Sequence, residues 1–126
     1  MLTVGVDILE LWRIKGVLES WGQRFLDRIY TSQEQAYCRG RIPQLAARFA
    51  AKEAVMKALG TGIRGVGWRD IEVTRQRGQP PQINLHDRAM RRAAHMGMTQ
   101  ISLSLSHSRE YAVASVVMIT DEDSYS

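Results

Sequence analysis

Residues 45–67 have the sequence LAARFAAKEAVMKALGTGIRGVG, and this stretch decides how the rest of the chain is organised. Up to Gly60 it is rich in Ala, Leu and Met and contains neither Pro nor Gly, which predicts a strong helix closed by a glycine cap. Pro43 precedes it at a place where a missing N–H does no harm to a helix start. We therefore expect a helix from about Pro43 to Leu59.

The predicted helix carries charges where an apolar face is expected. At about 100° per residue, one side of it collects five apolar residues: Leu45, Phe49, Val55, Met56 and Leu59. Arg48 and Lys52 project among them, and Glu53 and Lys57 lie along the border. A surface ion pair and long side chains with buried stems would explain this pattern without a function. Buried charge is otherwise costly unless it is paired, bound to metal or aimed at a ligand, so the pattern also suits a specific partner.

Length and composition predict one globular domain over residues 1–120, followed by an acidic tail, 121–126, that we expect to be disordered. The chain has 126 residues, 44% of them hydrophobic. Cys38 is its single cysteine, which excludes an intrachain disulfide. The N-terminus lacks the basic start of a signal peptide, and no run of 18 apolar residues could span a membrane. We expect a cytoplasmic protein.

The folded body is basic. Seventeen Lys and Arg against ten Asp and Glu give residues 1–120 a formal charge of +7, since three of the 13 acidic residues stand in the tail. A basic surface implies an acidic partner, which is a nucleic acid, an anionic small molecule or an acidic protein. A basic module that binds nucleic acid is the alternative function. It predicts arginines grouped with stacking aromatics, whereas the nine aromatic residues are scattered along the chain.

The hydrophobic pattern predicts an α+β fold. Strands are expected at 2–9, 68–74, 82–86, 99–107 and 111–119, in one small, mostly antiparallel sheet packed against the central helix and the helices before it. Alternation is clearest at 99–107. Residues 11–41 have helical periodicity, with a capping box at Thr31 and Glu34.

Several polar residues occupy unusual places in these elements. Asp7 lies between apolar neighbours on the first strand, and His107 continues the apolar phase of its strand to the very end. The glycines from Gly60 to Gly67 would let backbone N–H groups approach a phosphate, although a cap followed by a flexible loop has the same composition. The chain has no G-x-S-x-G, Walker A or Rossmann motif and no Cys/His metal spacing.

Three segments together resemble the 4′-phosphopantetheinyl transferase superfamily, in particular its holo-acyl-carrier-protein synthases. They are GVDILELWRI at 5–14, RFAAKEAVMKALGTGI at 48–63 and SLSHSREYAVASVV at 104–117. The resemblance implies an enzyme that transfers 4′-phosphopantetheine from coenzyme A to a serine hydroxyl of an apo acyl carrier protein, releasing adenosine 3′,5′-bisphosphate. Mg²⁺ is the implied cofactor, with Mn²⁺ also open.

The resemblance also implies roles for the reacting groups. Asp7 and Glu53 match the family's metal ligands, and Glu53 would activate the serine hydroxyl directly or through a metal-bound water. Lys57 would neutralise the pyrophosphate. Arg48 and His107 match positions that contact the nucleotide phosphates. Gly60 and Gly62 lie in the loop that would run close to the nucleotide. Lys52 matches no such role.

The remaining expectations concern partners. Arg13, Arg24 and Arg28 with Phe25 form either a solvated helix face or, as the family implies, a docking face for the acidic carrier protein. The family implies a homotrimer with active sites at subunit boundaries. A relative that keeps the fold but has lost transfer is disfavoured by the presence of Asp7, Glu53, Lys57 and His107. The sequence leaves open whether the carrier serves fatty-acid or polyketide synthesis.

Overall fold

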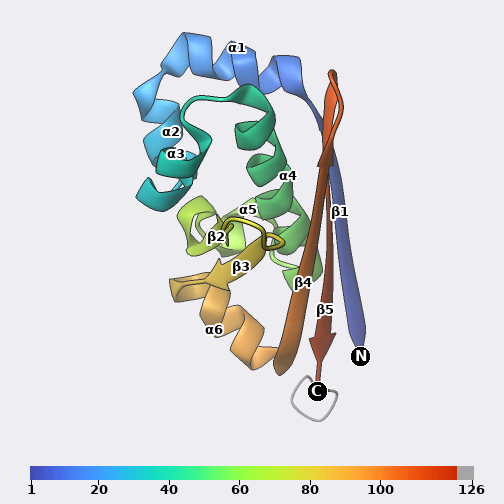
Figure 1. Ribbon diagram of the computed structural model, residues 1–126. Helices are drawn as coiled ribbons and strands as arrows, with labels where there is room; N and C mark the ends of the chain where they lie inside the picture. Colours follow the sequence, from blue (N-terminus) through green and yellow to red (C-terminus); the bar gives the residue numbers. More distant parts are fainter. Residues whose placement is uncertain (122–126) are drawn as a thin grey trace.

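Helices cover one face of a three-stranded antiparallel sheet in the computed structural model, which describes residues 1–121 (Figure 1). The sheet has the order β1-β5-β4, with β1 at Leu2–Glu10, β5 at Tyr111–Thr120 and β4 at Met98–His107. Three helices, α1 (Leu11–Trp21), α2 (Gln23–Ile29) and α3 (Ser32–Cys38), lead to the central helix α4 (Ile42–Leu59). The short helices α5 (Gly62–Gly65) and η1 (Trp68–Asp70) follow, and then β2 (Ile71–Thr74), β3 (Gln82–Leu85) and α6 (Asp87–His95). The tail beyond Asp121, predicted to be disordered, lies outside the described residues.

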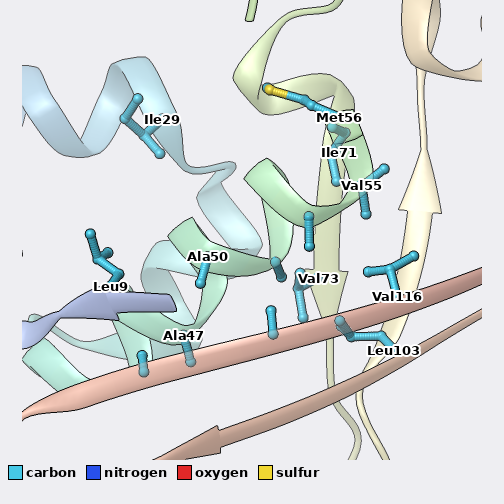
Figure 2. Close-up of a cluster of buried hydrophobic side chains, with 14 of the residues drawn as sticks. Leu9, Ile29, Ala47, Ala50, Val55, Met56, Ile71, Val73, Leu103 and Val116 are labelled. Atoms are coloured by element: carbon cyan, nitrogen blue, oxygen red, sulfur yellow. The ribbon is translucent and has the colours of Figure 1, made fainter. Parts of the chain in front are cut away.

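The central helix confirms the prediction made from residues 45–67. Pro43 lies in its first turn, and Gly60 ends it in the left-handed conformation, with φ of 70°. The helix is buried on most of its circumference, because the three-stranded sheet packs on one side of it and α3 and β2 on another. Figure 2 shows Ala47, Ala50, Val55 and Met56 of α4 in one cluster with side chains from the surrounding strands.

Strand β1 lies unusually close to α4 at Gly5. A Cβ built on Gly5 would lie 1.9 Å from the carbonyl oxygen of Ala54, inside any allowed contact distance. The absence of a side chain therefore permits the approach of the two backbones. The same face of β1 carries Asp7 and Leu9, because side chains alternate along a strand.

The opposite face of β1 is apolar and exposed. Leu2, Val4, Val6 and Ile8 have exposed fractions between 52% and 64%. Leu2 pairs with Ile119 and Val4 with Val117, both also exposed on β5, so the patch spans two strands. The alternation of side chains along β1 was predicted correctly. The strand packs on α4 through the face with fewer hydrophobic side chains, because Gly5 leaves room there for the helix backbone.

The α+β class is confirmed, whereas the five strands do not form one sheet. Strands β2 and β3 pair only with each other, as a hairpin with Ile71 opposite Leu85. The strand predicted at 68–74 begins at Ile71, because residues 68–70 form a 3-10 turn in which Asp70 Oδ2 accepts the Gly67 N–H at 3.0 Å.

Replacing Gly5 by Ala should destabilise the protein by about 3 kcal/mol or more, because the new methyl group must displace backbone rather than a side chain. Urea denaturation followed by circular dichroism measures this. Gly16→Ala is the control, since an added Cβ in this α1 position meets nothing within 4 Å. The control should gain about 0.5–1 kcal/mol from helix propensity. Equal stability of the Gly5 variant and wild type would contradict the close contact.

Candidate active site

Asp7, Glu53 and Lys57 form one charged cluster between β1 and α4. Lys57 Nζ donates to Asp7 Oδ1 at 3.0 Å and to the Val6 carbonyl at 2.9 Å. The Lys57 side chain is 55% exposed, whereas that of Asp7 is 13% exposed, so the pair has one solvent-facing side. Glu53 lies one turn before Lys57 on α4 and hydrogen-bonds to the Asp7 carboxyl group. The cluster thus joins residues about 50 positions apart that the sequence predicted as partners.

The Glu53 carboxyl group has a pKa near neutrality. The pKa of Glu53 is raised from 4.5 to about 7, mainly by burial and also by the negative charge and hydrogen bond of Asp7. Lys57 and Arg13 act in the opposite direction. A carboxyl group with a pKa near 7 can accept a proton from a substrate at physiological pH, which suits a general base.

The two carboxyl groups fit a hard divalent cation. Mg²⁺ typically binds one or two protein carboxylates and completes its coordination with water and substrate phosphate oxygens. The mutual repulsion of Asp7 and Glu53, visible in the raised Glu53 pKa, is what a cation would relieve. Within residues 1–121, no group of three or more His, Cys, Asp or Glu side chains could hold a metal by itself. Residues 1–121 therefore do not supply a complete set of protein ligands for a metal ion.

Arg48 lies elsewhere on α4 and is 3% exposed. Its guanidinium stacks over the Tyr37 ring at 4.2 Å, and one nitrogen donates to the Gln44 carbonyl at 3.3 Å. Its Nε has no hydrogen-bond partner among the described residues. A buried cation with donors left over is a candidate for an anionic ligand.

A cavity of about 520 Å³ opens beside the Arg48–Tyr37 stack, between α3 and the β2–β3 hairpin. Most of its lining is polar or amphipathic: Gln33, Tyr37, Thr74, Arg75, Gln79 and Asn84. Its volume lies within the range of small-molecule sites. Sequence reasoning missed this cavity, because its walls come from α3 and from a hairpin whose pairing with α3 no local pattern reveals.

The cavity and the charged cluster lie on opposite sides of α4. Arg48 and Lys57 are nine residues apart, which places them about half a turn apart around the helix and about 14 Å apart along it. His107, the last residue of β4, is exposed and pairs with Ala112 of β5. Since β5 separates β4 from β1, the structure does not bring His107 into the Asp7 cluster. Gly60 caps α4, and Gly62 begins α5 with φ of 63°.

The predicted docking residues gather on α1 and α2. Arg13 stacks on Trp12 and Arg24 on Trp21, each at 5.7 Å, and Arg28 is exposed nearby. Phe25 is 9% exposed and packs edge-on against Tyr30, so it forms the floor of this surface and does not project from it. The exposed rings of Trp12 and Trp21 were not singled out from the sequence, although Trp beside Arg is a signal that could have found them.

A family model described as "4′-phosphopantetheinyl transferase superfamily" matches residues 3–116. The chain belongs to the 4′-phosphopantetheinyl transferase superfamily. A relative named holo-[acyl-carrier-protein] synthase, from Gloeobacter violaceus, is 50% identical over 120 residues, covering 92% of this chain and 91% of the relative.

Solved structures of superfamily members have the same fold. The holo-[acyl-carrier-protein] synthase of Neisseria meningitidis gives a TM-score of 0.86 at 35% identity, covering 94% of this chain and 98% of that one. The Helicobacter pylori enzyme of the same name, in complex with coenzyme A, gives 0.84 at 29% identity, covering 92% and 99%. The resemblance noted in the sequence is confirmed, as is the fold.

The raised pKa of Glu53 predicts a pH-dependent stability in EDTA. The folded protein holds the Glu53 proton more tightly than the unfolded chain, so its stability should fall between pH 4.5 and about 7 and then level off. Glu53→Gln removes the titrating carboxyl group, so the variant should not lose this stability as the pH rises. After allowance for solvent screening at a half-exposed group, the variant should be about 1–2 kcal/mol more stable than wild type at pH 8, and equal to it at pH 4. Urea denaturation at both pH values measures the difference, and parallel profiles for the two proteins would contradict the assignment.

Proposed function

We propose that this protein transfers the 4′-phosphopantetheine group of coenzyme A to a serine hydroxyl of an apo acyl carrier protein. The observation that carries the proposal is the Asp7–Glu53–Lys57 cluster, in which two carboxyl groups and one ammonium group meet on rigid elements. Membership of the superfamily over residues 3–116, and relatives named as holo-[acyl-carrier-protein] synthases, support the same reaction.

The chemistry follows from the charges. The serine oxygen attacks the phosphorus that bears the pantetheine arm, and the bond from that phosphorus to the bridging oxygen breaks, so that adenosine 3′,5′-bisphosphate leaves. Glu53 takes the serine proton, directly or through a water molecule. Lys57 places positive charge beside the leaving phosphate, and Asp7 holds the Lys57 ammonium group in position.

Mg²⁺ is the cofactor that the donor set fits best, with Mn²⁺ as a second choice. Asp7 and Glu53 would hold it, and the ion would neutralise pyrophosphate oxygens when bound. The support is the meeting of two carboxyl groups: after burial, the negative charge of Asp7 is the next cause that raises the Glu53 pKa, and a cation would relieve that repulsion.

The nucleotide end of coenzyme A is assigned to the cavity beside Arg48. Arg48, whose Nε has no partner among the described residues, lies behind the lining residue Tyr37 and would supply charge for a phosphate, and the polar lining suits a nucleoside. His107, Gly60 and Gly62 remain proposed contacts of the same ligand, near the phosphates.

We further propose a homotrimer in which each site lies between two copies of the chain. The cavity and the charged cluster lie on opposite sides of a buried helix, so a ligand within one chain has no direct path between them. The apolar patch on β1 and β5 offers a self-association surface, since exposed patches of this kind mark interfaces.

The carrier protein is proposed to dock on α1 and α2. Val17, Trp21 and Phe25 line a groove that is edged by Arg24 and Arg28, with Asp27 as its one acidic lining residue. Arg13 adds positive charge on α1 outside this groove. A basic rim around an apolar floor suits an acidic helix. A cytoplasmic enzyme of fatty-acid synthesis is the setting that we propose, and the relatives' name, holo-[acyl-carrier-protein] synthase, supports only the acyl carrier protein as a partner.

The transfer reaction is tested by the intact mass of a purified apo acyl carrier protein after incubation with this protein and coenzyme A. We expect the mass of one phosphopantetheine to be added with Mg²⁺ and none in EDTA. Asp7→Asn and Lys57→Met should each lower kcat/KM by about a hundredfold or more. The first weakens the proposed Mg²⁺ site and the hold on Lys57, and the second removes positive charge at the reacting phosphate. Asp87→Asn, at an exposed site on α6, is the control and should be fully active. No transfer to several carrier proteins would contradict the proposal.

Assembly is tested by light scattering after size-exclusion chromatography. Wild type should have three times the chain mass of 14.3 kDa, whereas Val4→Lys should be a monomer that has lost most transfer activity, because it places charge in the apolar patch. Met90→Lys is the matched control at an equally exposed position on α6. A fully active monomeric wild type would contradict the shared site.

A further inference from the structure

Lys52 is completely buried in α4 and uses every proton of its ammonium group. It donates to Glu34 Oε1 at 2.8 Å, to the Trp68 carbonyl at 3.1 Å and to the Ile71 carbonyl. The Lys52 and Glu34 side chains each have 0% exposure. Burial lowers the pKa of Lys52, and the charge of Glu34 opposes that effect. The ion pair therefore joins α4, α3 and the start of the hairpin at one point.

Glu34 is equally well satisfied. Its Oε1 also accepts the Thr31 N–H at 2.9 Å, within the capping box of α3, and its Oε2 accepts the Val73 N–H of β2 at 2.9 Å. Thr31 adds a second link, since its hydroxyl donates to Glu72 Oε2 at 2.6 Å. The first turn of α3 is thus fastened to β2 through both residues.

A buried ion pair of this kind is poor evidence for stability, because well-packed apolar side chains of similar volume often stabilise as much. What it does impose is geometry. Every acceptor and donor has a fixed direction, so α3 and β2 can occupy only one relative position.

The two elements that Glu34 joins are the two walls of the cavity beside Arg48. Helix α3 contributes Gln33 and Tyr37, which flank Glu34 in sequence and along the helix, and β2 contributes Val73 and Thr74. Arg48 lies one turn before Lys52 on α4 and stacks on Tyr37. A shift of α3 relative to β2 would change the width of the cavity and move the Tyr37 ring that supports Arg48.

We propose that Lys52 and Glu34 are positioning residues for the nucleotide end of coenzyme A. They fix the spacing of the α3 and β2 walls, and through Tyr37 the direction of Arg48. This inference rests on the proposed function and on the assignment of the nucleotide to this cavity. Neither residue touches the reacting phosphate, so their replacement should weaken coenzyme A binding while the chemical step is preserved.

The main test variant is Lys52→Met/Glu34→Gln, which removes both charges together and so leaves no unpaired buried charge. Steady-state transfer assays should show the KM for coenzyme A raised by about tenfold or more, with kcat within about threefold and the KM for the carrier protein unchanged. The inhibition constant of adenosine 3′,5′-bisphosphate should rise by the same factor, because this product contains the nucleotide end alone.

Two further variants separate positioning from stability. Glu34→Asp keeps the charge pair but shortens the side chain, so it should raise the KM for coenzyme A by several-fold even if the double variant fails to fold. Met118→Ala removes buried volume from β5, on the sheet side of α4, and serves as the destabilised control. Its KM for coenzyme A should equal that of wild type.

Hydrogen exchange of the Val73 amide provides a readout independent of turnover. The amide should exchange faster in Glu34→Asp than in wild type, and binding of adenosine 3′,5′-bisphosphate should slow exchange in wild type. An unchanged KM for coenzyme A in folded Lys52 and Glu34 variants, or an equal rise in Met118→Ala, would overturn the positioning role while the transfer activity of wild type stands. Absence of transfer by wild type would overturn both.

Discussion

The close contact of β1 with α4 at Gly5 is the constraint on which the rest of the structure depends. Because Gly5 lacks a side chain, the strand backbone lies directly against the Ala54 carbonyl. Asp7, two residues further along the same face, is thereby brought to Glu53 and Lys57, which flank Ala54 on the helix. A steric requirement at one glycine therefore produces the charged cluster, and the raised pKa of Glu53 follows from it.

Helix α4 directs its four charges at side chains of two neighbouring elements, α3 and β1. Lys52 points into the interior and binds Glu34, Arg48 packs on Tyr37 of α3, and Glu53 and Lys57 face β1. This explains why the helix has no simple amphipathic pattern. One rigid element thus carries both the groups proposed for phosphoryl transfer and the arginine assigned to the nucleotide, about 14 Å apart along the helix axis.

Helix α4 also stands between the two parts of the proposed site, the cavity near Arg48 and the charged cluster at Asp7. This arrangement bears on the role of the outer face of the sheet. The sheet is covered by helices on one face only (Figure 1), and the other face carries the exposed apolar residues of β1 and β5. In the proposed homotrimer, a second copy of the chain would bring together ligand groups that lie on opposite sides of α4. The exposed patch is the surface proposed for that association.

The sequence alone determined the central helix, the long strands, the α+β class and the family. An Ala-rich run ended by Gly60, the alternation at 99–107 and the three motifs are local signals, and they pointed to Asp7, Glu53 and Lys57 before any contact was known. Tertiary structure alone decided which face of β1 is buried, that 71–85 forms a separate hairpin, and that Lys52 pairs with Glu34, 18 positions away. It also set the pKa of Glu53. The physical reason is that periodicity reports only neighbours along the chain, whereas steric fit, burial and charge pairing depend on segments that the fold brings together.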